Sequence, residues 1–186
     1  MIKIKIHPSS ALWLGGLIAI GVKNPAGYFL PIVFHELCHV AAAILLKRKI
    51  AALTLGASGL LIDIKGVLSY AEQLVISASG PLGSLLLYAL LRNVYPSCAL
   101  ISLALGIINL IPFSTFDGRG ILYPALCSIL PSDKCERAFR VIDVLGVAAL
   151  MLFATSALVL TRYNASVLFI AIYMFALTFL KNDGIF

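Results

Sequence analysis

Charged residues are scarce in this sequence. Only 12% of its 186 residues are Asp, Glu, Lys or Arg, whereas 61% are hydrophobic, and the mean hydropathy is +1.05. A soluble domain of this composition would have difficulty staying in solution. We therefore expect an all-α polytopic membrane protein that forms a single domain over residues 1–186, with little chain left for a soluble appendage.

Acidic residues are the scarcer of the two charged kinds, 8 against 14 Lys and Arg, which gives a net charge of +6. A basic balance is typical of nucleic-acid-binding proteins, but here the basic residues are scattered between apolar runs and are not gathered on one face with aromatics. They indicate membrane topology instead. We expect a lipid bilayer and membrane proteins as partners, and no nucleic acid.

Paired cysteines and repeats are also lacking. The four cysteines form no C-x-x-C pair and have no disulfide spacing, so we expect Cys38, Cys98, Cys127 and Cys135 to be unpaired packing residues. We find no internal repeat, no low-complexity tract and no small-x-small cleavage site after the first apolar run, so we expect that run to be retained.

Apolar runs of span length, separated by short polar segments, predict about six transmembrane helices. We place them at about 9–22, 27–46, 72–91, 97–113, 139–160 and 166–180. Residues 1–7 alternate apolar and polar, as a strand does. The glycine-punctuated stretch 50–67 is too short to cross a bilayer and predicts a β-hairpin; an ordinary interfacial loop is the alternative. The small residues at 77–84 predict close helix packing.

The distribution of basic residues predicts the orientation. With these spans, eleven of the 14 Lys and Arg fall on one side of the membrane. The positive-inside rule then places both termini, the hairpin and the segment around residue 117 on the cytoplasmic side.

Two of the three histidines lie in a very apolar stretch as His35-Glu36-x-x-His39. At about 100° per helical residue, all three polar side chains fall within one quadrant of a helix. Zinc hydrolases need this arrangement, since two imidazoles hold the metal and a neighbouring carboxylate takes a proton from water. Ionisable groups at membrane depth normally mark a functional site.

A zinc hydrolase usually has a third protein ligand. Asp117 combines proximity to the membrane with a helix broken by Pro112 and with flexible flanking glycines, and we therefore expect it on unwound chain at the end of a span. The alternative is that Asp117 only forms a turn before Gly118. We interpret Asp143 as an ordinary interfacial carboxylate.

At this point the residues resemble a known family. His35-Glu36-x-x-His39 and Asn109-x-x-Pro112-x-x-x-x-Asp117-Gly118 are similar to the two signatures of the site-2 protease family of intramembrane zinc metalloproteases. The six-span layout with its glycine-rich hairpin looks most like the stage IV sporulation protein FB branch. Ser84 departs from the family, because relatives often have asparagine after the Gly-Pro-Leu motif.

The resemblance implies one Zn²⁺ per chain held by His35, His39 and Asp117, with Glu36 as general base and Asn109 in the substrate groove. It implies cleavage of a membrane-embedded or membrane-associated substrate near the cytoplasmic face, in regulated intramembrane proteolysis of, for example, a sporulation transcription-factor precursor. Regulatory membrane subunits are further expected partners.

Two rival interpretations remain at this stage. A membrane metal-ion transporter or carrier would use the same polar residues, but we find no inverted repeat, and a carrier has no need of Glu36. A structural membrane subunit would pair its polar residues among themselves.

Overall fold

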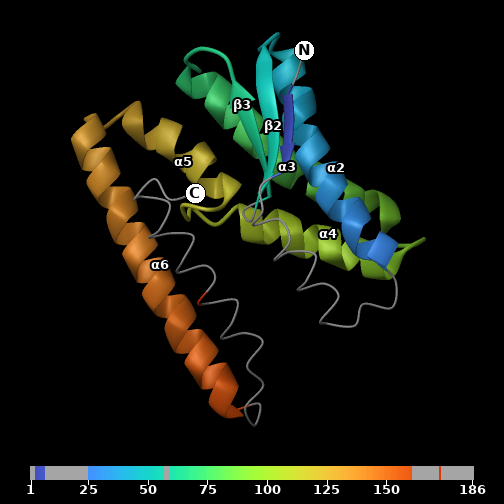
Figure 1. Cartoon of the computed structure of the whole chain (residues 1–186). Coiled ribbons are helices and arrows are strands. Elements are labelled where there is room, and N and C mark those ends of the chain that lie inside the picture. The colour runs from blue at the N-terminus through green and yellow to red at the C-terminus, as the bar shows by residue number, and fades with distance from the viewer. Residues whose placement is uncertain (1–2, 7–24, 57–58, 161–171, 173–186) are drawn as a thin grey trace.

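The computed structural model describes residues 3–6, 25–56, 59–160 and 172 of the chain. In these ranges the elements follow in the order β1 (Lys3–Ile6), α2 (Pro25–Leu45), β2 (Ile50–Gly56), β3 (Gly59–Ile64), α3 (Tyr70–Leu91), α4 (Pro96–Asn109), α5 (Asp117–Cys127) and α6 (Ser132–Leu160). The sheet lies at one end of the molecule, and α6 extends away from that end (Figure 1).

The second and third predicted spans match α2 and α3 to within two residues at each end. The fourth ends at Asn109, before the expected limit of 113, and the fifth begins at Ser132, well before residue 139. The first and sixth predicted spans, 9–22 and 166–180, lie outside the described residues. The described part of the chain is thus mostly helical with a small sheet.

The predicted hairpin and N-terminal strand form one three-stranded sheet in the order β1-β2-β3. Strand β1 runs parallel to β2, with Lys3 opposite Ala52, and β3 runs antiparallel to β2, with Leu60 opposite Leu55. A bulge between Ile50 and Ala52 shifts the register of β2. The predicted hairpin is confirmed, because β2 and β3 pair with each other up to Gly56 opposite Gly59, and this pairing excludes the alternative of an ordinary loop.

An ion pair joins the end of α2 to the start of α3. Ser69 and Glu72 form a capping box that satisfies the first backbone N–H groups of α3. Arg48, which follows α2, donates to both oxygens of the Glu72 carboxylate and, over 3.2 Å, to the Val67 carbonyl. The hydrogen bond that it donates to Glu72 raises the pKa of Arg48 above its ordinary value. These contacts help to hold α2 beside α3 at the end nearest the sheet.

Small residues let α3 pack closely between α2 and α4, as predicted. A Cβ atom at Gly83 would lie 3.1 Å from Cys38 Cβ in α2, and one at Gly106 in α4 would lie 3.2 Å from both the Pro81 carbonyl oxygen and Ser84 Cβ in α3. Residues Pro81, Gly83, Ser84 and Gly106 are accordingly buried. The backbones of the three helices approach each other where no larger side chain fits.

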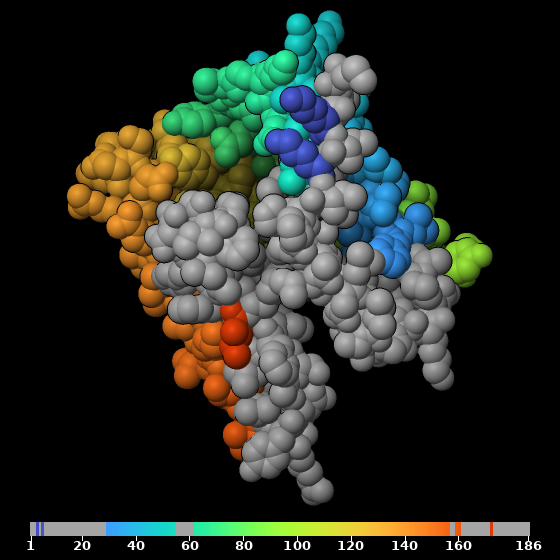
Figure 2. Space-filling view, viewed as in Figure 1, coloured from blue at the N-terminus to red at the C-terminus, as the bar shows by residue number. Residues whose placement is uncertain are grey.

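Among the described residues, α3 and the Ser132–Ser156 part of α6 are long and apolar enough to cross a membrane, and the apolar stretches Phe29–Leu45 and Pro96–Asn109 are shorter. Large apolar side chains on the two long helices are exposed, as Leu82 (61%) and Leu152 (70%) illustrate. Figure 2 shows α6, in orange, running along one side of the molecule. Contact with water disfavours such surface by about 25 cal/mol per Å², so it suits a lipid environment.

The prediction of unpaired cysteines is wrong for Cys127 and Cys135. These residues form a disulfide between the end of α5 and the first turn of α6, with their Cα atoms 5.8 Å apart. The chain folds back within a separation of 8 residues, and spacing alone does not reveal such a reversal. Cys38 and Cys98 are free, as expected.

Candidate metal centre

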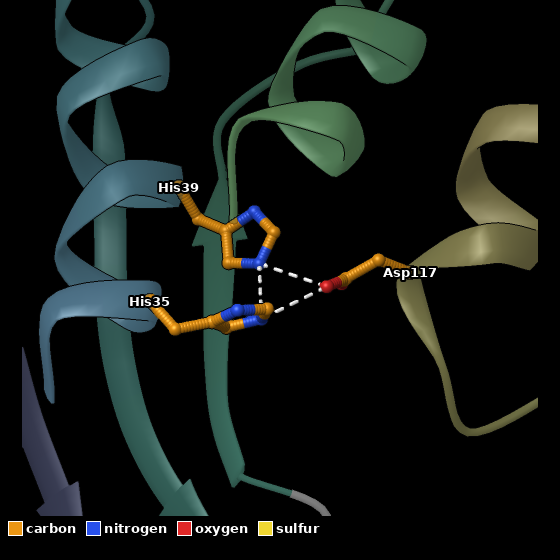
Figure 3. A group of neighbouring side chains, drawn as sticks. All are labelled: His35, His39 and Asp117. Carbon is orange, nitrogen blue, oxygen red and sulfur yellow. Dashed lines mark hydrogen bonds and ion pairs between the residues drawn. The ribbon is translucent and has the colours of Figure 1, made fainter. Parts of the chain in front are cut away.

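The structure brings His35, His39 and Asp117 together. The two histidines are one helical turn apart on α2, and their imidazoles are buried, with 5% and 8% of the side chain exposed. Asp117 Oδ2 lies 3.0 Å from His35 Nε2 and 3.2 Å from His39 Nε2, and the two Nε2 atoms are 3.3 Å apart. In Figure 3 the imidazoles of α2 and the carboxylate of Asp117 point toward a common centre.

A tight reversal of the chain between α4 and α5 delivers Asp117 to this centre. Helix α4 ends at Asn109, and the turn that follows includes a 2.9 Å hydrogen bond from Phe116 N–H to the Phe113 carbonyl. A Cβ atom at Gly118 would lie 2.5 Å from the Ile111 carbonyl carbon, so only glycine fits there. Asp117 is the first residue of α5, which corrects the expectation that it lies on unwound chain.

Hydrogen bonds at the other nitrogen orient each imidazole. The Nδ1–H of His39 donates to the Ile76 carbonyl over 2.7 Å, and because a carbonyl only accepts, Nε2 of the neutral ring carries the free lone pair. His35 Nδ1 lies 2.8 Å from Ser84 Oγ, and with Nδ1–H donating to this oxygen His35 would take the same tautomer. Partners of this kind set the orientation of metal-binding histidines.

The donor set fits a divalent cation. In these tautomers the two Nε2 atoms and Asp117 Oδ2 are all acceptors, and they lie within 4.8 Å of one another. Without a shared proton or cation, lone pairs at such distances repel. Zinc bound tetrahedrally at about 2.0–2.1 Å would separate its ligand atoms by roughly 3.3–3.4 Å. The observed separations of 3.0 to 3.3 Å need little adjustment to reach that value.

The backbone of α3 lies directly against the two imidazoles at Gly80. A Cβ atom there would be 2.8 Å from His35 Nε2, 2.5 Å from His39 Cε1 and closer still to His39 Nε2. Interpreting 77–84 as packing alone therefore missed two contributions to the centre: the absence of a side chain at Gly80, which leaves room for the imidazoles, and the contact of Ser84 Oγ with His35 Nδ1. The sequence signal for them was the density of small residues opposite the histidine motif.

Two further predicted site residues are not part of the three-residue cluster. Glu36 follows His35 on α2 and is half-buried. Asn109 ends α4, where its Nδ2 donates to the Leu105 carbonyl over 2.9 Å. The roles predicted for both residues stay predictions.

A polar cavity of about 390 Å³ opens beside Asp117. Residues of α3, of the turn before α5, of α5 itself and of α6 line it, and most carry hydrogen-bonding side chains: Gln73, Ser77, Ser114, Phe116, Asp117, Arg119, Gly120, Tyr123 and Glu136. One predicted metal ligand is thus accessible from a polar space.

No protein-family model matches this chain, and no curated protein matches it in sequence. Its structure is similar to that of the site-2 protease from Methanocaldococcus jannaschii, with a TM-score of 0.70, 23% identity, and coverage of 92% of this chain and 86% of that one. The chain has the fold of that site-2 protease.

Proposed function

We propose that this chain is an intramembrane zinc metalloprotease of the site-2 protease family. The observation that carries the proposal is the convergence of His35 Nε2, His39 Nε2 and Asp117 Oδ2 within 3.3 Å of one another, with the hydrogen bond to the Ile76 carbonyl leaving His39 Nε2 available to a metal. The shared fold and the exposed apolar faces of α3 and α6 support the membrane setting and the reaction class.

His35, His39 and Asp117 would hold the ion. Bound zinc supplies Lewis-acid chemistry, which polarises a peptide carbonyl and lowers the pKa of a coordinated water. Glu36 takes the proton from the attacking water and delivers it to the leaving amine, so that one peptide bond breaks and one water is consumed. Burial of the two imidazoles restricts bulk water around the reacting groups.

A substrate segment has to be extended to reach the centre, and its freed backbone groups need partners. Strand β3 is at one edge of the three-stranded sheet. Lys65 N–H donates to the Lys49 carbonyl over 2.9 Å, toward β2, so by strand alternation Ile62 and Ile64 direct their N–H groups to the open edge. We propose that the substrate adds there as a further strand and that Asn109 assists in the groove.

The remaining features of the proposal come from the sequence. Positive-inside counting supports a multi-pass protein with both termini and the metal centre toward the cytoplasm. The likeness to the stage IV sporulation protein FB branch supports a membrane-associated transcription-factor precursor as substrate and regulatory membrane subunits as partners.

Replacing Glu36 by Gln tests the proposal. We expect the purified Glu36→Gln protein to retain one zinc per chain and to lose cleavage by about 10²–10⁴-fold, the usual contribution of a general base. The substrates are single-span peptides with a helix-breaking sequence near the cytoplasmic end, in lipid vesicles. Asp133→Asn, an exposed change in the first turn of α6, is the control and should cleave normally.

The outcomes separate the rival functions. A wild-type protein that binds no zinc contradicts the metal site itself. Stoichiometric zinc with zinc transport into vesicles, unaffected by Glu36→Gln, would instead identify a carrier.

A further inference from the structure

One buried carboxylate holds the chain on both sides of Asp117. Asp143 in α6 is only 9% exposed, which corrects its interpretation as an ordinary interfacial residue. Its Oδ1 accepts a 2.9 Å hydrogen bond from Ser114 N–H, and its Oδ2 accepts a 2.6 Å bond from Arg119 Nη1. Ser114 precedes Asp117 by three residues and Arg119 follows it by two, so the two bonds enclose the predicted ligand.

The same face of α6 supports these contacts by packing. Phe139, Asp143 and Gly146 are spaced by four and three residues and therefore share one side of the helix. The Arg119 guanidinium carbon lies 5.1 Å from the centre of the Phe139 ring. A Cβ atom at Gly146 would lie 3.0 Å from two ring atoms of Phe113, so the turn before α5 rests directly on α6.

We propose that Asp143 and Arg119 are positioning residues that hold the Asp117 carboxylate in place beside the imidazoles of His35 and His39. The inference rests on the proposed metal site. Residues 110–116 form no regular helix, so the backbone hydrogen bonds of α4 do not hold this turn in place. The Asp143 carboxylate of α6 holds it instead, through Ser114 N–H. This partly buried ion pair contributes little net stability, because desolvation offsets the attraction. Its effect here is geometric and acts on the metal ligand.

Four variants of the full-length protein in detergent test this role: Asp143→Asn, Arg119→Met, the double variant, and the control Glu136→Gln. Asn preserves the size of Asp143 and an acceptor for Ser114 N–H but loses the charge that Arg119 binds. Glu136 is a more distant partner of Arg119, at 3.9 Å, and its side chain is 55% exposed. Each variant is measured for zinc affinity by chelator competition and for the visible spectrum of bound Co²⁺.

We expect each single variant to bind zinc about 10–100-fold more weakly, the usual effect of removing a group that orients a metal ligand. The double variant should be no weaker than the weaker single one, because the two residues act as one pair. The Co²⁺ spectrum should change in these three proteins and stay as in wild type in Glu136→Gln. A spectrum reports ligand geometry, which a purely structural role would leave intact.

Three results would overturn the inference. Unchanged zinc affinity in both single variants, with zinc bound normally by the wild type, contradicts it and leaves the proposed function standing. A lower melting temperature with an unaltered Co²⁺ spectrum assigns the pair a structural role only, as do additive losses in the double variant. Absence of zinc from the wild-type protein is a separate result, because it contradicts the proposed function itself.

Discussion

Gly80 provides the sharpest test of the proposed metal centre, because a single methyl group there would enter the space beside the Nε2 atoms of both histidines. In Gly80→Ala the new Cβ would lie 2.8 Å from His35 Nε2 and 2.5 Å from His39 Cε1, well inside van der Waals contact. One or both rings therefore have to move. Neither moves freely, since His39 is hydrogen-bonded to the Ile76 carbonyl at 2.7 Å and His35 to Ser84 at 2.8 Å.

The expected magnitude follows from these contacts. Displacing a ring sacrifices a hydrogen bond of about 1 kcal/mol, and overpacking adds about 1–3 kcal/mol. A total of roughly 2–4 kcal/mol, at 1.4 kcal/mol per factor of ten, weakens zinc binding by about 30–700-fold. The zinc-free protein should lose less stability than these figures imply, because Ala in place of Gly favours a helix by up to about 1 kcal/mol.

Gly83→Ala is the matched control in the same helix. A Cβ atom at Gly83 would also be crowded, but by Cys38, 3.1 Å from its Cβ, and not by the histidines. We expect this variant to lower the melting temperature of the protein while its zinc affinity, measured by chelator competition, falls less than tenfold. Wild-type zinc affinity in Gly80→Ala, or an equal loss in Gly83→Ala, would refute the reasoning.

Two further changes test other parts of the proposal. Ser84→Ala removes the partner of His35 Nδ1 and should weaken zinc binding about 10–100-fold. The control Ser102→Ala removes only a bond to the Ser84 carbonyl and should leave zinc binding unchanged. Equal affinities of the two variants in chelator competition would exclude an orienting role for the Ser84 hydroxyl. Ile62→Pro removes one N–H that β3 directs away from β2, and it should slow cleavage without changing zinc content. The control Ile62→Ala retains that N–H and should cleave normally. Unimpaired cleavage by the proline variant would exclude substrate binding by strand addition.

The sequence predicted those parts of the fold that follow from local pattern. Hydrophobic run length located α2 and α3 closely, alternation located the N-terminal strand, and glycine punctuation in a stretch too short to cross a bilayer located the hairpin. The start of α6 was missed because its first turns are polar, with Asp133, Lys134 and Glu136 exposed beside the buried Cys135 and Phe139. When a helix begins in a polar region and continues into an apolar one, hydropathy detects only its apolar part.

The residues of the candidate site also divide into those that local pattern predicted and those that it did not. His35 and His39 face one point because helix geometry over four residues dictates it, and Asp117 was chosen from the break that Pro112 and its glycines impose. The residues that surround these proposed ligands come from other helices: Gly80 and Ser84 from α3, and Asp143 from α6. Their roles depend on tertiary contacts across tens of residues, and the Ile76 carbonyl has no side-chain signal at all.

The surroundings of the imidazoles also help to distinguish a resident ion, which would stay in the protein, from an ion that the protein would transport. The partner of His39 Nδ1 is a backbone carbonyl of α3, and the close neighbour of both rings is the α3 backbone at Gly80. Neither group has a side-chain rotamer that would let it withdraw, so opening the centre from this side requires α2 and α3 to separate where Gly83 packs on Cys38. A carrier has to open its site to both sides of the membrane, whereas a hydrolase needs only one stable opening. The polar cavity beside Asp117 meets that need, and this contrast favours a resident ion.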